Sequence, residues 1–66
     1  MVRVEMIMND TITFTSNVDF NTVQLMMNSD FITLNRNTIK VEAKEVTSDG
    51  LVRFYGLKAK PEEYFK

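Results

Sequence analysis

The residue types that most often carry catalysis are missing from this chain, which contains neither histidine nor cysteine. These side chains supply the common proton shuttles, thiolate nucleophiles and zinc ligands of proteins. The hydroxyls of Ser16 and Ser48 lie where helix caps and turns use serine, and neither has an evident base nearby in the sequence. We therefore expect a protein that is not an enzyme, with no catalytic residue and no cofactor.

The carboxylates lack the spacing of a catalytic pair or of a metal site. Glu62 and Glu63 are neighbours in the C-terminal tail, and Glu42 and Glu45 should point to opposite faces of one strand. The aspartates do not have the regular spacing of a calcium-binding loop. The sequence therefore predicts no metal site.

A set of basic and aromatic residues has the character of a binding site. Lys40, Lys44, Arg53 and Tyr55 are expected on one face of the last two strands. Basic side chains beside an aromatic ring can hold a phosphate backbone while a base stacks on the ring. Glu42 interrupts the set and the net charge is −1, so single-stranded nucleic acid is the alternative partner and not the first choice.

The same face also has the composition of a protein interface. Val46, Tyr55 and Leu57 would form an apolar centre, surrounded by a rim of mixed charge. Tyr64 and Phe65 in the tail could extend this interface, or could fold back and cover it within one chain. We expect contact with a second copy, as a homodimer or larger assembly, or with another protein.

Size and composition favour self-association. A chain of 66 residues with 44% hydrophobic residues should fold, but its small core gives marginal stability, and disulfides and zinc cannot supplement it. Charges at Arg3 and Glu5 interrupt the apolar core that a signal peptide needs, and no apolar run is long enough to cross a membrane. We expect a cytoplasmic protein without a membrane partner.

Alternating apolar residues predict two N-terminal strands, over 2–8 and 11–15. A three-residue loop of Asn9, Asp10 and Thr11 would pair Met8 with Ile12, and so keep the apolar residues of both strands on one face.

Residues 16–29 permit two interpretations. As a helix, from roughly Asp19 to Asn28, the segment would begin at a capping box formed by Ser16 and Asp19. Phe20, Val23 and Met27 would then form one apolar stripe, with a second stripe opposite. Residues 22–25 also fit a strand, so helix is preferred and strand stays open.

Two further hairpins are predicted. A turn of Arg36 and Asn37 would match Ile32 and Leu34 with the apolar residues of the next strand. Asp49-Gly50, a strong two-residue turn signal, would lead to a fifth strand with Val52 and Phe54 on the face of Ile39, Val41 and Ala43.

The predicted fold is α+β, with a mostly antiparallel sheet of about five strands and one short helix over residues 1–57, and a C-terminal tail or short helix over 58–66. A small all-β barrel is the second choice. The predicted core consists of Val4, Met6, Ile12, Phe14, Phe20, Val23, Met27, Ile32, Leu34, Ile39, Val41, Val52 and Phe54.

Two resemblances are present. Residues 29–34 and 41–44 resemble the middle hairpin of phosphocarrier domains of the sugar phosphotransferase system, but the histidine of that family is absent, so the resemblance implies no phosphocarrier activity. The short chain, rich in Asn, Thr and Met, resembles small accessory proteins of phages and mobile elements.

Overall fold

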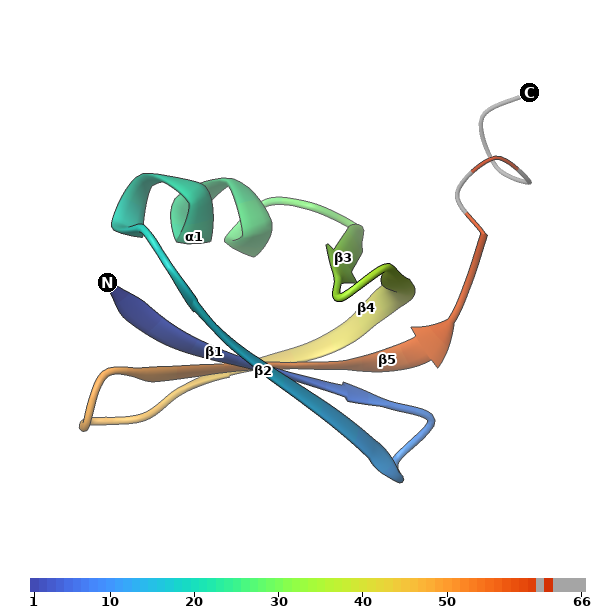
Figure 1. Cartoon of the computed structure of the whole chain (residues 1–66), viewed down its shortest axis with the longest axis horizontal. Helices are drawn as coiled ribbons and strands as arrows, with labels where there is room; N and C mark the ends of the chain where they lie inside the picture. The colour runs from blue at the N-terminus through green and yellow to red at the C-terminus, as the bar shows by residue number, and fades with distance from the viewer. Residues whose placement is uncertain (61, 63–66) are drawn as a thin grey trace.

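The computed structural model describes residues 1–60 and 62. Five strands and one helix follow one another as β1 (Val2–Met8), β2 (Ile12–Val18), α1 (Phe20–Met27), β3 (Phe31–Leu34), β4 (Asn37–Val46) and β5 (Leu51–Lys58). The strands form one sheet in the order β2-β1-β5-β4-β3. All neighbours are antiparallel except β1 and β5, which are parallel (Figure 1). The predicted α+β class is confirmed.

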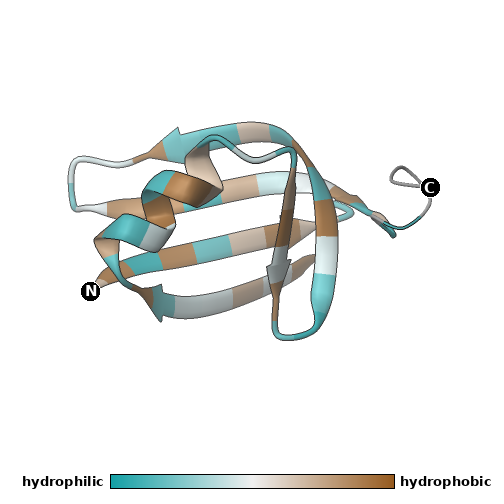
Figure 2. Ribbon diagram, turned by 90° about the horizontal axis from the view of Figure 1, so that it is seen from above, coloured by the Kyte–Doolittle hydropathy of each residue, from teal (hydrophilic) through white to brown (hydrophobic). Residues whose placement is uncertain are grey.

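The sheet curls into a half-barrel around its apolar face. Figures 1 and 2 show α1 lying over this face, with β3 and the adjoining part of β4 bent over it beside the helix. The pairing of β4 with β5 shifts between Val41 and Ala43, and such a bulge bends a strand and increases its twist. Gly56 lies opposite Val41, where a Cβ atom would be 2.0 Å from the carbonyl oxygen of Lys40. Glycine therefore permits the close approach of the two strands at the bend.

The first hairpin has the predicted register, with Met8 opposite Ile12 and Met6 opposite Phe14. Asn9 and Asp10 in its loop have positive φ angles of 55° and 63°, which Asn and Asp adopt more readily than most residues. The loop also contacts β5, because Asn9 N donates to the Gly56 oxygen and Asn9 Oδ1 accepts from Lys58 N, each at 3.0 Å. Asn9 thus extends the contact between the hairpin and β5.

The segment after β2 is a helix, and the strand interpretation is wrong. Asp19 is its N-cap: Oδ2 accepts a hydrogen bond from Thr22 N at 3.1 Å, and Oδ1 accepts one from Thr22 Oγ1 at 2.7 Å. Ser16 is not part of the cap, because β2 stays paired with β1 as far as Val18. The helix is only eight residues long, and no helix in the described part of the chain is long and apolar enough to cross a membrane.

The turn between β3 and β4 lies one residue earlier than predicted. Its two loop residues are Asn35 and Arg36, with φ angles of 50° and 66°, and positive φ at both positions is what a type I′ two-residue hairpin loop requires. Ile32 therefore pairs with Ile39 instead of Val41. The partner moves by two positions, so the apolar residues still share one face.

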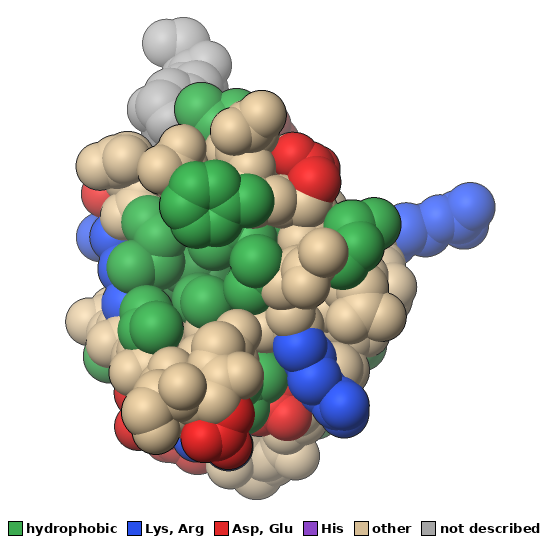
Figure 3. Space-filling view, turned by 90° about the vertical axis from the view of Figure 1, so that its left-hand side faces the viewer, with side chains coloured by type: hydrophobic (Ala, Val, Ile, Leu, Met, Phe, Trp, Pro, Cys, Tyr) green, Lys and Arg blue, Asp and Glu red, His purple; other side chains and the backbone are tan. Residues whose placement is uncertain are grey.

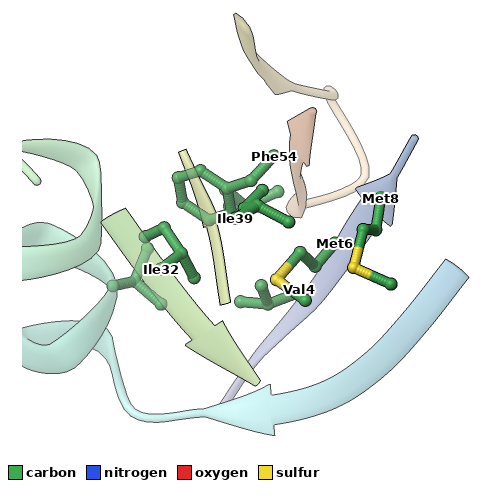
Figure 4. Packing of buried hydrophobic residues seen from close by; sticks show 8 residues of the cluster. Val4, Met6, Met8, Ile32, Ile39 and Phe54 are labelled. Carbon is green, nitrogen blue, oxygen red and sulfur yellow. The ribbon is translucent and has the colours of Figure 1, made fainter. Parts of the chain in front are cut away.

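Among residues 1–60 and 62, eight hydrophobic residues form the buried core, and seven of them were predicted: Val4, Met6, Val23, Ile32, Ile39, Val52 and Phe54, with Met8 as the addition. Six of the eight are labelled in Figure 4, where they point toward one another from four strands. Two predicted core residues are wrong. Ile12 is 45% exposed at the end of an edge strand, and Phe20 is 63% exposed in the first turn of α1.

Candidate interaction surface

The loop between β4 and β5 determines which residues lie on each face of the last hairpin. Thr47 N donates to the Leu51 oxygen at 2.9 Å, and Val46 pairs with Val52. The loop therefore contains Ser48, Asp49 and Gly50, with Gly50 at a φ of 89°. The predicted two-residue loop is wrong by one residue, and such an error turns side chains to the opposite face. Here it affects β4 between the loop and the register shift at Val41 and Ala43.

The predicted interface is consequently divided between two faces of the sheet. Val46 lies on the face that α1 covers, because it pairs with buried Val52, whereas Tyr55 pairs with Ala43 on the outer face. Leu57 shares this outer face with Tyr55 and is 52% exposed. Tyr64 and Phe65 lie outside the described residues.

The basic residues of the nucleic-acid alternative are also separated. Lys44 pairs with Phe54 on the helix side, and its Nζ donates to the carbonyl oxygen of Met27 at the end of α1. Lys40 pairs with Leu57 on the outer face, because the β4 bulge reverses the alternation between the two lysines. The predicted patch of Lys40, Lys44, Arg53 and Tyr55 is therefore not formed as one surface.

The cation of Arg53 is bound by two carboxylates on the outer face. Its Nε donates to Glu5 Oε1 and its Nη1 donates to Glu45 Oε1, each at 2.9 Å. The hydrogen bonds to Glu5 and then to Glu45 raise the pKa of Arg53 above its ordinary value. The three residues join β1, β5 and β4 in one row of the sheet.

An apolar groove runs between α1 and the sheet, on the side where β1 begins and β4 ends. Its volume is about 320 Å³, and it is lined by Val2, Phe20, Val23, Gln24, Met27, Val46, Gly50 and Val52. Figure 3 shows hydrophobic side chains gathered around a hollow on this side of the molecule. We call this feature the helix groove.

The helix groove combines buried and exposed apolar residues. Val23 and Val52 are buried, whereas Phe20 is 63% and Val46 60% exposed. The register of the β4–β5 loop places Val46 here, next to Val52. A helix of eight residues is too short to cover this end of the sheet. Exposed apolar residues gathered around a hollow are typical of sites that bind another molecule.

Hydrogen bonds at both ends of α1 hold the wall of the groove in place. At the N-terminus, the hydroxyl and then the backbone amide of Thr22 lower the pKa of Asp19 below 3.8. At the C-terminus, Ser29 Oγ donates to the Leu25 oxygen at 2.7 Å, and Lys44 donates to Met27. A cation at a helix C-terminus also interacts favourably with the helix dipole. The two caps compensate for a helix in which only Val23 is buried.

A second groove, of about 290 Å³, lies on the other side of α1, and its lining includes Val18, Thr22, Leu25, Met26 and residues of β3. Leu25 is 70% exposed. The second apolar stripe predicted on the helix is therefore not covered by another layer. This stripe indicated in the sequence that apolar surface would lie around α1. Nothing in the sequence predicted that Phe20 and Val46 would lie together in the helix groove.

No protein-family model, curated protein or solved structure matches this chain. Among the described residues, no group of three or more acidic side chains is placed to hold a metal ion.

Proposed function

We propose that this protein is a non-enzymatic interaction protein that self-associates and holds an apolar side chain of a protein partner in the helix groove. The observation that supports this proposal best is the groove itself, with buried Val23 and Val52 beside exposed Phe20 and Val46. The partner would fill the helix groove with an aliphatic or aromatic side chain.

The energetics favour such a partner. Complete burial of an apolar side chain contributes about 1.5–3 kcal/mol, and covering Phe20 and Val46, which are 63% and 60% exposed, would recover part of this for each. A gain of this size is a substantial fraction of the total stability of ~5–15 kcal/mol that a domain usually has. Since the core of the described structure consists of only eight buried residues, covering the groove would stabilise the fold markedly.

The nucleic-acid alternative has no specific observation in its favour. Lys44 interacts with the end of α1, and Arg53 with two carboxylates. Binding of a phosphate backbone through these residues would have to replace contacts within the protein. The only biological setting that we propose is a phage or mobile element, and it rests on the resemblance to their accessory proteins.

The groove can be tested without a known partner by titrating short acetylated peptides, each with one Leu, Phe or Trp between glycines and serines. Methyl resonances of Val2, Val46 and Val52 should shift in NMR spectra, and Val46→Asp should abolish the shifts. Leu57→Asp is the matched control, because it places the same charge at a similarly exposed apolar residue on the outer face. Unchanged groove resonances at millimolar peptide would reject the groove as a binding site.

Self-association is tested by molar mass from light scattering across a concentration series. We expect a dimer or larger assembly. A monomer at every concentration would reject this part of the proposal.

A further inference from the structure

β2 is a free edge of the sheet within the described part of the chain. All seven of its residues pair with β1 without a bulge, and β2 is the first strand in the sheet order. Figure 2 shows it as the border of the sheet opposite β4. An edge strand presents unpaired N–H and C=O groups, and natural proteins usually protect such an edge with charges, proline, a bulge or a very short strand.

None of these protections is present on β2. Its sequence, from Ile12 to Val18, has no charged residue and no proline, although 26% of the chain is charged. The other edge strand, β3, has only four residues, and its side chains line a groove together with α1. Most residues of β2 are of types that favour extended backbone, namely Ile12, Thr13, Phe14, Thr15 and Val18. β2 is therefore well suited to pairing with another strand.

We propose that two copies of this chain pair through their β2 strands, antiparallel and around a two-fold axis at Thr15. This inference rests on the proposed self-association and specifies how it occurs. The register places Thr15 opposite Thr15 of the second copy, Thr13 opposite its Asn17, and Ile12 opposite its Val18. It pairs all seven residues of the strand and brings no like charges together.

The second copy in this register covers apolar surface that one chain leaves exposed. Ile12 is 45% exposed and would lie against Val18 of the second copy. Val18 lines the second groove beside α1, together with Leu25. Directly opposed residues of antiparallel strands point to the same face, so both α1 helices lie over the same face of one continuous sheet. The helix groove of each copy involves no residue of β2 and stays open to a partner.

The absence of native cysteine allows a direct test with single-cysteine variants. Thr15→Cys places two thiols opposite each other, at a Cβ separation of about 4.5–5.5 Å. Thr13→Cys and Asn17→Cys are matched controls, because both positions are exposed on the same face of β2. Each control thiol lies about 13 Å along the strand from its own equivalent. We expect Thr15→Cys to form the disulfide-linked dimer at least about tenfold faster on oxidation with diamide.

A mixture of Thr13→Cys and Asn17→Cys provides an independent readout, since these positions face each other. It should form the mixed disulfide faster than either variant forms its own. Circular dichroism confirms that each variant is folded before oxidation. A dimer by light scattering whose three variants oxidise at equal rates would overturn the β2 pairing and leave self-association standing. A chain that is monomeric at every concentration would reject both the β2 pairing and the proposed self-association.

Discussion

Arg53 on β5 and Glu5 on β1 form a 2.9 Å ion pair across the parallel strand pair, between residues 48 positions apart in the sequence. Arg53 also reaches Glu45 on β4. The side chain of Arg53 is 33% exposed, and that of Glu5 20%. A single guanidinium therefore links the three central strands of the sheet on their outer face.

Replacement of Arg53 by Met should lower the midpoint of thermal unfolding. The change leaves two carboxylates, Glu5 and Glu45, near each other without their shared cation. The difference from the wild type should decrease as salt is added, because salt screens partly exposed charges. Arg3→Met, also on the outer face of the sheet, is the control and should change the midpoint less. A difference that is independent of salt would show that Arg53 acts through packing.

Gly56→Ala should be strongly destabilising. The new methyl group would lie 2.0 Å from the Lys40 carbonyl oxygen, so the backbone at the β4 bulge must move. We expect the free energy of unfolding to fall by at least about 2 kcal/mol in urea titration. Gly50→Ala is the comparison, since nothing lies within 4 Å of its added Cβ. Its positive φ should cost only about 1 kcal/mol, and an equal or larger loss at Gly50 would contradict the steric argument.

The N-terminus of α1 should depend on pH through Asp19. Hydrogen bonds from Thr22 lower the pKa of this carboxyl below 3.8 in the folded state. The ionised cap therefore stabilises the helix above the unfolded pKa, and this contribution is lost as the pH falls through the lower folded pKa. The amide resonance of Thr22 should titrate with a midpoint below 3.8. Asp19→Asn keeps a capping side chain and should remove the titration, whereas a midpoint at or above 3.8 would argue against the cap.

Met6→Ala should destabilise the core by about 2–5 kcal/mol in chemical unfolding. Met6 is fully buried and is among the largest completely buried side chains, so its truncation leaves a cavity between the sheet and the elements that cover it. Met1→Ala is the matched control, because Met1 is 91% exposed. Similar unfolding free energies for the two variants would contradict the position of Met6 in the core.

The first hairpin and the helix could be predicted because several signals agree there. Only one loop length places Met8 opposite Ile12 with all apolar residues on one face, and the structure has that register. The helix boundaries were predicted to within a residue, although its cap is Asp19 and not Ser16. Ser16 was misassigned because β2 extends to Val18, and a capping-box pattern does not show whether the preceding strand continues.

The last hairpin could not be predicted in detail, because two irregularities compensate for each other. Because the loop contains the additional residue Ser48, the side chains of β4 near Val46 lie on the face opposite to the predicted one. The bulge at Glu42 returns the side chain of Val41 to its predicted face. The core residues Ile39 and Phe54 therefore lie on the expected face, and their pattern gives no sign of either irregularity. Between them, residues 43–46 contain no clear apolar alternation that would fix the register. The candidate site was misplaced for this reason.

The parallel pairing of β1 with β5 has a consequence for how the chain folds. These strands are the first and the last of the described part of the chain, yet they lie side by side at the centre of the sheet. During synthesis, the β1–β2 hairpin emerges from the ribosome long before β5, and an isolated hairpin is at best marginally stable in water. The centre of the sheet can form only after Leu51–Lys58 has been made, and closing so long a loop slows folding. Folding of the sheet therefore requires β5 and cannot proceed strand by strand in the order of the sequence.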